Sequence, residues 1–378
     1  MTSANTPATR LATRLAFLVA GFGMAAWAPL VPFAKERLGV DDAVLGILLL
    51  CLGLGSVLAM MLTGVLSTRF GAKPIILAGG IGLAVVLPLL TIASTPLTLG
   101  IALLAFGASL GSIDVAMNLH AVEVERAAGR PMMSGFHALF SIGGLAGATL
   151  MTVLLSVRAG PTQSALLCTA LMAMAIFVIS PRLLRTAPDS GGPLFVAPHG
   201  IVLLLAALTC IIFLAEGAML DWGALYITDA NLMPPAQAGL GYILFSVTMT
   251  IGRLTGDWIT ARIGDRMTLL WGGMITVLGF AVLLTAPQAF LALTGFLLIG
   301  LGASNIVPVL FRQAGRQTVM PAGLAIAAVT TSGYAGILLG PALIGFAAHA
   351  VGLQTSFWML AALVALVPLM GRRATSGG

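Results

Sequence analysis

Charged residues are scarce in this chain of 378 residues: only 8% are Asp, Glu, Lys or Arg, whereas 59% are hydrophobic. A soluble domain carries about 25% charged residues, because its surface must be hydrated. A chain so poor in charge cannot cover a water-facing surface, which excludes an ordinary soluble protein. The net charge is +6, but the basic residues lie in short segments between apolar runs. We therefore expect contact with a lipid bilayer and no nucleic-acid partner.

Cysteine is also rare, and its placement excludes two kinds of site. Cys51, Cys168 and Cys210 all lie inside apolar stretches without CxxC spacing, so neither a disulfide framework nor a metal centre is expected. The four histidines lack metal-ligand spacing, and the chain has no HExxH, GxSxG or P-loop lysine. We therefore expect no enzyme and no cofactor.

Long apolar runs are what the sequence has in abundance. A membrane-spanning helix needs about 20 predominantly apolar residues, and the first such run is too long for the apolar region of a signal peptide. We predict an all-α membrane protein with twelve transmembrane helices. The predicted spans are 15–33, 43–65, 75–94, 98–121, 132–156, 163–181, 201–227, 239–260, 268–286, 289–311, 323–348 and 354–371.

Basic residues fall mainly on one side of these spans. Loops on that side hold fourteen of the 18 Lys and Arg residues, whereas loops on the other side hold only Lys35, Arg37 and Arg158. Cytoplasmic loops of membrane proteins carry an excess of Lys and Arg, so this bias predicts that both termini are cytoplasmic. We expect a multi-pass protein of the inner (plasma) membrane.

An internal repeat at an offset of 193 residues runs through the sequence. Pairs at this offset include Arg69 with Arg262, Gly71 with Gly264, Lys73 with Arg266, Gly107 with Gly300 and Ile113 with Ile306. One register that holds from residue 64 to residue 340 without gaps predicts two homologous halves of six helices each. The predicted halves are 1–181 and 201–378, and the segment 182–200 between them is a polar linker interrupted by Pro and Gly.

The loop after the second span resembles a known family signature. The segment Gly64–Lys73 is similar to the signature G-x-x-x-D-R-x-G-R-[RK] of the major facilitator superfamily, with Thr68 in place of the Asp and Ala72 in place of an Arg. Runs similar to the fucose-permease-like branch of this superfamily, which includes uncharacterised inner-membrane proteins, are 114–118, 123–126, 134–144, 216–222 and 252–257. The resemblance covers nearly the whole chain and implies the major facilitator fold, with two pseudo-symmetric six-helix halves.

This resemblance also implies roles for residues of the loop. In the family the loop gates the cytoplasmic side of the transporter. We therefore expect gating or structural roles for Arg69, Gly71 and Lys73, and for Arg262 and Gly264 in the second copy of the loop. Thr68 stands in place of the family's Asp, so the first copy lacks the carboxylate of the family's charge pair.

Ionisable and amide side chains inside the spans are candidates for function, because they are expensive to place in a bilayer. The resemblance implies that spans 1, 4, 7 and 10 line a central cavity. The candidates for substrate binding or proton coupling are Asp114 and Asn118 in span 4, His137 in span 5, Glu216 and Asp221 in span 7, and Asn305 in span 10.

Three of these candidates are expected to form one polar cluster. Asp114 and Asn118 are four residues apart, so they share a helix face. At 1.5 Å per residue, Asp114 lies about 12 Å and His137 about 8 Å from the cytoplasmic side. The cluster is interpreted as a substrate or proton site. The alternative is a hydrogen-bonded set that only fixes helix packing.

Glu216 near the middle of span 7 is the first choice for proton coupling, because a carboxyl in a low-dielectric environment can exchange a proton near neutral pH. The alternative is a permanently protonated Glu that bonds to a neighbouring helix. Asp221 lies about 140° further around an ideal helix. It therefore shares no face with Glu216 unless Gly217 or Gly223 breaks the helix, and it is equally compatible with the periplasmic boundary.

Arg253 and Asp257 are four residues apart near the cytoplasmic end of span 8. We predict that they form a structural or gating pair, because a lone Arg inside a span is costly. In span 11, unlike span 5, the sequence contains the G-x-x-x-G-P signature of antiporters, at Gly336–Pro341; in span 5, Gly147 is followed by Ala148. This placement counts against a proton/drug antiporter.

Three functional hypotheses remain open. The leading one is proton-coupled uptake of a small polar solute, such as a sugar, by a monomer that alternates access to a mid-membrane site. The alternative is an efflux transporter for amphipathic compounds, which the apolar interior and the 18 methionines favour. The third is a membrane protein that senses or binds a partner without transport.

Overall fold

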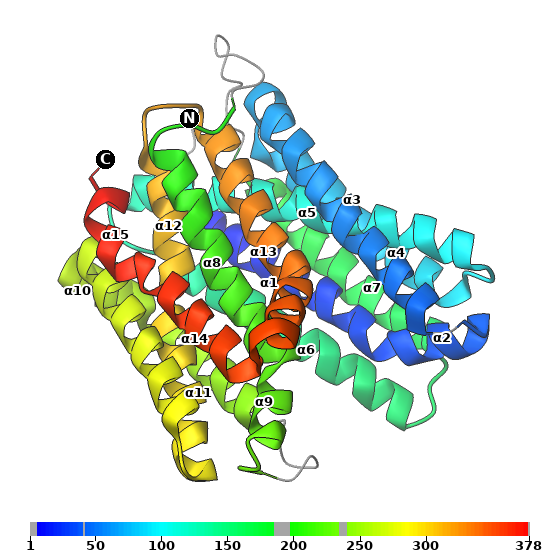
Figure 1. The fold of residues 1–378 in the computed structure, drawn as a ribbon. Coiled ribbons are helices and arrows are strands. Elements are labelled where there is room, and N and C mark those ends of the chain that lie inside the picture. Colours follow the sequence, from blue (N-terminus) through cyan, green and yellow to red (C-terminus); the bar gives the residue numbers. More distant parts are fainter. Residues whose placement is uncertain (1–5, 41, 185–196, 234–239, 377–378) are drawn as a thin grey trace. The chain divides into compact units, whose positions relative to one another are not determined.

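The computed structural model describes residues 6–40, 42–184, 197–233 and 240–376, and these ranges are almost entirely helical (Figure 1). The helices are α1 (Pro7–Trp27), η1 (Ala28–Leu30), α2 (Val31–Leu38), α3 (Asp42–Phe70), α4 (Ala72–Ile92), α5 (Pro96–Ala128), α6 (Met133–Ser156), α7 (Pro161–Ile179), η2 (Ser180–Arg182), α8 (Ile201–Asp221), α9 (Gly223–Asp229), α10 (Leu240–Thr285), α11 (Ala289–Ala303), α12 (Ile306–Arg316), α13 (Ala322–Val351), α14 (Leu353–Val364) and α15 (Leu366–Ala374).

The predicted all-α membrane architecture is confirmed. Within the described ranges, eleven helical segments are long and apolar enough to cross a membrane. One of them, α10, has 46 residues and is interrupted at Gly264, where φ is 81° and ψ is 163°. This helix therefore comprises two of the predicted spans, 239–260 and 268–286. With that division the structure accounts for all twelve predicted spans.

Two spans break close to predicted site residues. The seventh span consists of α8 and α9, which meet at Trp222, directly after Asp221. The tenth consists of α11 and α12, and Asn305 caps the start of α12 with φ −106° and ψ −2°. Interrupted helices expose backbone polar groups at membrane depth, which transporters use where a cavity must be polar.

The chain forms two compact units by its contacts. Unit 1 comprises Met1–Gly129, Phe136–Ala197 and Gly323–Ala327, and unit 2 comprises Arg130–Gly135, Pro198–Ala322 and Ala328–Gly378. Each unit holds most of one six-helix half. The segment that leads into α6 and its first residues belong to unit 2, however, and the first residues of α13 belong to unit 1.

The predicted linker at 182–200 lies largely outside the described residues, so the proposed division of the chain at 181 and 201 stays a prediction. Residues 183 and 184 are described, and both leucines there are buried in unit 1. On the other side of the gap, α8 begins at Ile201, directly after Gly200, whose φ of 56° favours glycine.

Helix packing repeats at the predicted offset. In unit 1, a Cβ atom on Gly107 would lie 1.9 Å from the carbonyl oxygen of Leu52. In unit 2, a Cβ on Gly300 would lie 2.3 Å from the carbonyl oxygen of Phe245, and both members of this pair are 193 residues further on. Because any larger residue would overlap the backbone, glycine allows α5 to approach α3 and α11 to approach α10.

The turns after the second and eighth spans repeat as well. Gly71 between α3 and α4 has φ 74°, and Gly264 within α10 has φ 81°. L-residues with a side chain rarely adopt this region, so glycine is required at both turns. The shared backbone geometry supports the repeat that was predicted from the two basic loops.

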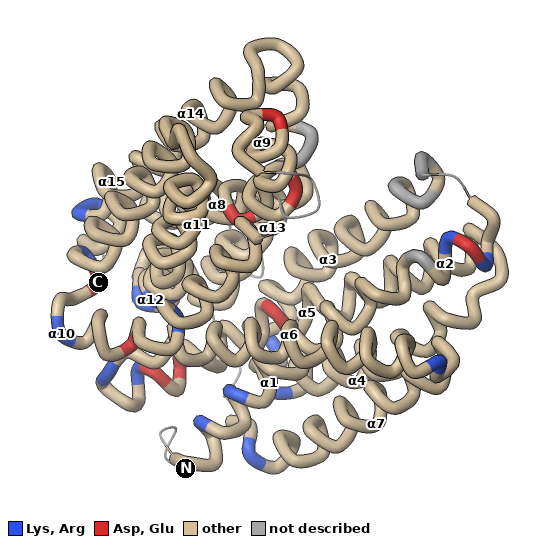
Figure 2. Tube along the Cα trace, turned by 90° about the horizontal axis from the view of Figure 1, so that it is seen from below, with Lys and Arg blue, Asp and Glu red and all other residues tan. Residues whose placement is uncertain are grey.

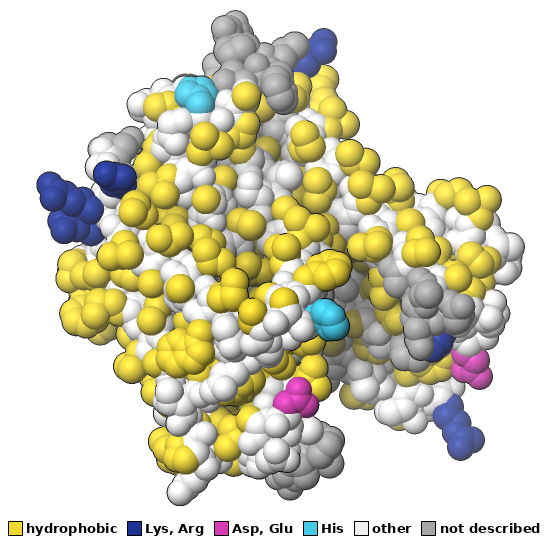
Figure 3. Space-filling model, viewed as in Figure 1, with side chains coloured by type: hydrophobic (Ala, Val, Ile, Leu, Met, Phe, Trp, Pro, Cys, Tyr) yellow, Lys and Arg dark blue, Asp and Glu magenta, His cyan; other side chains and the backbone are white. Residues whose placement is uncertain are grey.

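Most of the visible surface is apolar, as a lipid-facing surface must be. Figure 3 shows hydrophobic side chains over most of the drawn face, with few charged ones. Figure 2 shows Lys and Arg mainly near the ends of helices, whereas the middles of the helices carry few charges. Exposed Leu, Ile and Phe side chains are common on the described helices, which fits immersion in a bilayer.

Candidate functional site

An ion pair between α8 and α10 is the main charged feature inside the spans of unit 2. The Arg253 Nη2 atom lies 3.5 Å from the Glu216 Oε1 atom. Their side chains are 10% and 21% exposed, respectively. Such a pair costs desolvation energy for both ions and is rarely retained in a membrane helix without a role. The sequence predicted a role for both residues but did not predict that they meet.

Tyr242 at the start of α10 lies near the same charges, and the sequence did not single it out. The charges of Glu216, Asp221 and Arg253 all act on its phenol, and its ring stacks on Phe245 with centroids 5.8 Å apart. A phenol inside a span that neighbours carboxylates adds a donor and an acceptor to the site. Tyr242 could have been selected from the sequence by its position in the first turn of the predicted span 239–260.

Asp221 occupies a different place from Glu216. It is the last residue of α8 and is exposed. The helix breaks at Trp222, immediately after it and next to Gly223, one of the two glycines that were predicted to allow a break. The structure therefore shows the break that the sequence left open.

Asn305 lies at the break between α11 and α12, and its side chain binds the backbone of α10. Its Nδ2 donates to the Gly252 carbonyl at 2.9 Å and lies 3.0 Å from the Ser304 Oγ. Its Oδ1 is buried, and no hydrogen-bond partner for this atom lies among the described residues. The side chain fills the space over Gly256, where a Cβ would approach Oδ1 to 1.6 Å. Asn305 thus packs against α10 at Gly252 and Gly256, the segment that contains Arg253.

The polar pair of unit 1 lies on α5. The Asn118 Nδ2 donates to the Asp114 Oδ1 at 3.1 Å and to the Asp114 carbonyl at 2.9 Å. Asp114 is 9% exposed and Asn118 is fully buried. The four-residue spacing correctly predicted that these side chains meet. The Asn118 Oδ1 is buried with no hydrogen-bond partner within the described part of the chain.

His137 lies in the first turns of α6, and its ring packs edge-on against Phe17 of α1 with centroids 5.2 Å apart. It is 9% exposed. Phe17 also stacks on Phe136 at 5.9 Å, so the imidazole lies at the edge of a small aromatic cluster. The predicted three-residue cluster of His137 with Asp114 and Asn118 stays a prediction.

Asp257 binds the beginning of α6 within unit 2. Its Oδ1 accepts the backbone N–H of Ser134 at 2.9 Å, and its Oδ2 accepts that of Gly135 at 2.7 Å. A carboxylate at a helix N-terminus satisfies free N–H groups and interacts favourably with the helix dipole. The predicted pairing with Arg253 is not needed to explain why an Asp is placed here, and that pairing stays a prediction.

Ionic contacts at the second copy of the loop were not all predicted. Arg262 stacks over the Trp258 ring at 3.9 Å. Asp265, which was not among the predicted residues, accepts from the Arg312 Nη1 at 2.5 Å and from the Gln313 Nε2 at 2.6 Å. Arg312 is 1% exposed, so this contact ties α10 to α12. Asp265 could have been selected from the sequence as a partner for a basic residue, because it is a carboxylate inside a basic loop.

The first copy of the loop differs from the second. At its Asp position stands Thr68, whose hydroxyl donates to the Val65 carbonyl at 2.7 Å. Arg69 stacks over Phe70 at 5.4 Å, and Lys73 lies at the start of α4. The Thr68 hydroxyl thus bonds within its own helix. At the offset of 193 the residue equivalent to Asp265 is Ala72, which has no carboxylate with which to bind a neighbouring helix.

Comparisons with known proteins give a consistent picture. A sequence profile of the Major Facilitator Superfamily matches residues 14–232 and 200–375. An uncharacterized MFS-type transporter of Yersinia pestis is 50% identical over 367 residues, which cover 97% of this chain and 96% of that protein.

Two solved structures share the fold at low sequence identity. The human organic anion transporter MFSD10 superposes with a TM-score of 0.78 and 16% identity, covering 97% of this chain and all of that chain. A structure of the Escherichia coli fucose:proton symporter FucP also has a TM-score of 0.78, with 15% identity. The match covers 99% of this chain and all of that chain. At these identities the likeness concerns the fold alone.

Proposed function

The chain belongs to the Major Facilitator Superfamily and is a multi-pass membrane transporter, and from this premise we propose that it takes up a small polar solute, such as a sugar, together with protons. Transport proceeds by alternating access to a mid-membrane site. The protein acts as a monomer in the inner membrane, with both termini in the cytoplasm. The excess of Lys and Arg in the loops on the side of the termini supports this orientation.

The observation that carries the proposal is the ion pair of Glu216 and Arg253 at 3.5 Å. Proton coupling needs a carboxylate whose protonation changes a second interaction. Protonation of Glu216 would remove the charge that faces Arg253 and leave its guanidinium ready for hydroxyl or anionic groups of a solute. Tyr242, on which both charges act, would then offer a further hydrogen bond.

We assign the polar groups of unit 1 to binding of the solute. The Asp114–Asn118 pair presents an amide oxygen with no partner among the described residues, and an unpaired buried acceptor is expensive unless a ligand or water uses it. His137, whose ring packs against Phe17, and Asn305, whose amide bonds to the α10 backbone, are secondary candidates. Asp221 at the exposed end of α8 is assigned to solute entry.

Gating is assigned to the helix ends. Asp257 holds the start of α6, and the two positive-φ glycines, Gly71 and Gly264, turn the chain at the basic loops. Arg69, Lys73, Arg262 and Arg253 are the cations of these regions. The contacts that these cations make would break and form again as the transporter changes access from one side of the membrane to the other.

A ligand screen followed by uptake measurements tests the proposal. The purified protein is heated with sugars, organic acids, amino acids, nucleosides and cationic drugs at mildly acid and neutral pH, because a ligand of the folded state raises its thermal stability. The hit is then used for uptake into proteoliposomes driven by a pH gradient. Glu216→Gln should abolish gradient-driven uptake but keep solute exchange at equal concentrations. Exposed Glu36 in α2 provides the matched control, Glu36→Gln.

Two results would reject the coupling assignment or the substrate class. If Glu216→Gln and Asp114→Asn both leave gradient-driven uptake unchanged, these carboxyls carry no coupling. If only amphipathic drugs stabilise the protein, the alternative of an efflux transporter replaces uptake of a polar solute. The apolar spans and 18 methionines favour that alternative, because Met side chains adapt to irregular apolar ligands.

A further inference from the structure

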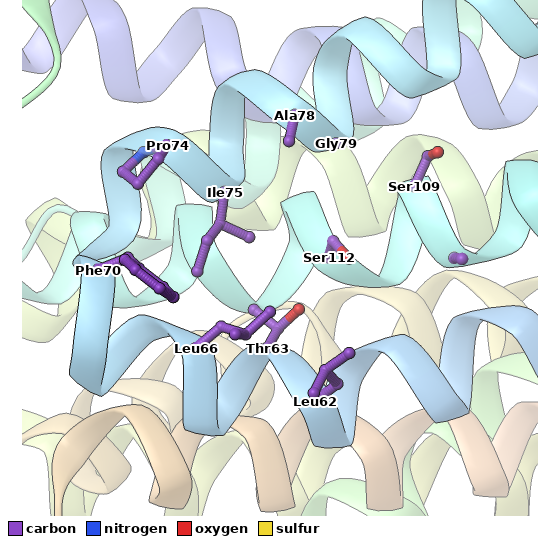
Figure 4. Close-up of a pocket in the computed structure, with 11 residues that line it drawn as sticks. Leu62, Thr63, Leu66, Phe70, Pro74, Ile75, Ala78, Gly79, Ser109 and Ser112 are labelled. Atoms are coloured by element: carbon purple, nitrogen blue, oxygen red, sulfur yellow. The ribbon is translucent and has the colours of Figure 1, made fainter.

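A groove of about 350 Å³ runs along α3, α4 and α5 on the surface of unit 1 (Figure 4). Leu62, Leu66 and Phe70 line it from α3 at helical spacing, and Pro74 and Ala78 line it from α4. Its rim is open, since Leu62 is 57% and Phe70 is 54% exposed. On a protein that spans a bilayer, an open apolar rim of this kind contacts lipid.

Two hydroxyl groups inside this groove lack partners. Ser109, at one end, donates to the Ala105 carbonyl at 2.8 Å, as hydroxyls in membrane helices usually do. Thr63 and Ser112 also line the groove (Figure 4), but their hydroxyls make no hydrogen bond within the described residues. Ser112 is half-buried and Thr63 is buried. An apolar groove lined by two such hydroxyl groups fits an amphipathic ligand better than a purely apolar one.

In the second repeat, the side chain of Asn305 occupies the space that corresponds to this groove. Asn305 is 193 residues after Ser112, and Gly256 is 193 residues after Thr63. There the Asn305 Nδ2 donates to the Gly252 carbonyl at 2.9 Å, and its Oδ1 fills the space over Gly256. In the first repeat Thr63 carries the side chain that Gly256 lacks, and Ser112 is shorter than Asn305. The groove in unit 1 is therefore lined by two hydroxyl groups where the second repeat places one amide side chain over a glycine.

Charge at one end of the groove has a single sign. Arg69 is exposed, and its guanidinium lies over the Phe70 ring at 5.4 Å. Lys73 precedes the lining residue Pro74. None of the described residues that line the groove is acidic. Basic side chains next to a membrane surface attract anionic lipids.

We propose that this groove binds one anionic phospholipid, with its phosphate at Arg69 and an acyl chain along Leu66 and Leu62. At 1.5 Å per residue, Thr63 lies about 10 Å along α3 from Phe70. The headgroup region of one leaflet is about 5–8 Å thick, so this depth lies just inside the hydrocarbon core, next to the ester groups of a lipid whose phosphate is at Arg69. The hydroxyls of Thr63 and Ser112 therefore donate to the glycerol ester oxygens. The site is independent of the transported solute.

Photolabelling of the full-length protein tests the proposal. The protein is placed in phosphatidylcholine nanodiscs that contain a small share of phosphatidylglycerol with a diazirine in its acyl chain. After irradiation, mass spectrometry locates the labelled peptides. Label should concentrate in residues 62–79 and 108–112. Unlabelled phosphatidylglycerol should compete, whereas extra phosphatidylcholine or inorganic phosphate should not.

Variants make the test specific. Ser112→Asn enlarges a side chain inside the groove and should remove most of the label, whereas Ser156→Asn, at an exposed serine of α6, should leave it unchanged. Arg69→Gln should lower the preference for phosphatidylglycerol by about fivefold, the effect of one basic residue at a membrane surface. Should Ser112→Asn fail to fold, Ala78→Phe fills the same groove from α4.

Three outcomes would overturn the proposal. The first is equal competition by phosphatidylglycerol and phosphatidylcholine, which would mean ordinary annular lipid. The second is label outside the two segments. The third is unchanged labelling in a folded Ser112→Asn or Ala78→Phe protein.

Discussion

Asp257 and Gly64 hold equivalent positions in the two repeats, but they meet the start of a neighbouring helix in different ways. In unit 2, Asp257 accepts the N–H groups of Ser134 and Gly135 at the beginning of α6, at 2.9 and 2.7 Å. In unit 1, Gly64 faces the beginning of α13, and a Cβ on it would lie 2.7 Å from the Cβ of Ala327.

The difference shows that one architecture is reached by two kinds of chemistry. The contact of Asp257 is between a charge and helix N–H groups, so loss of its charge weakens it. The contact of Gly64 depends on the absence of a side chain, so only size can disturb it. Of the two contacts, only that of Asp257 is part of the proposed gating, and only that one depends on a charge.

Removal of the Asp257 carboxylate should have the largest effect. Asp257→Ala leaves two N–H groups at the start of α6 without their acceptors, and each hydrogen bond to a charged group contributes about 1.5–3 kcal/mol. We expect a loss of about 3 kcal/mol in unfolding free energy, measured in detergent by chemical denaturation. Asp257→Asn keeps an acceptor and should lose less. Equal losses for Ala and Asn would show that the charge is unimportant.

Addition of a methyl group at Gly64 should have the second largest effect. Gly64→Ala forces its new Cβ against that of Ala327, and overpacking of this kind costs about 1–3 kcal/mol. Gly144→Ala is the matched control, since its Cβ would meet nothing closer than 3.8 Å. The free energies of unfolding of the two variants should differ by about 2 kcal/mol. A Gly64→Ala protein as stable as the control would contradict the close contact.

The two turn glycines should give equal and smaller effects. Gly71→Ala and Gly264→Ala each place a side chain at positive φ, 74° and 81°, which costs about 1–2 kcal/mol. Thermal unfolding should show similar losses for the two variants, since the repeats share this backbone geometry. A clear difference between the two would mean that the loops, like Asp257 and Gly64, are built differently.

Loss of the Arg262 stack should have the smallest effect. Arg262→Gln removes a cation from the Trp258 ring at 3.9 Å, and an exposed contact of this type contributes about 0.5–1 kcal/mol. Arg262→Lys, which keeps the charge, should retain part of this stability. A loss of stability well above this range would show that Arg262 makes further contacts.

Much of the fold was predictable because its signals are local or periodic. Apolar runs of about 20 residues mark the spans, and the offset of 193 residues pairs Gly107 with Gly300 on the residue order alone. The meeting of Asp114 with Asn118 was predictable for the same reason, since four residues place both on one helix face.

Contacts between distant parts of the sequence were not predictable. Glu216 and Arg253 are 37 residues apart on different helices, and Asp257 and Ser134 are 123 apart. Spacing suggested Arg253 and Asp257 as partners, because they share one helix, but it cannot identify which neighbouring helix supplies a partner. Asn305 was chosen for its polarity in a span, although its amide bonds to the α10 backbone.

The most direct test of the proposed function is proton movement caused by the solute. The protein is reconstituted into liposomes that contain a pH-sensitive dye, and the hit from the ligand screen is added outside without an imposed pH gradient. The account predicts acidification of the lumen by the wild-type protein and none by Glu216→Gln, although both bind the solute. Solute entry without acidification, or unchanged acidification in Glu216→Gln, would contradict it.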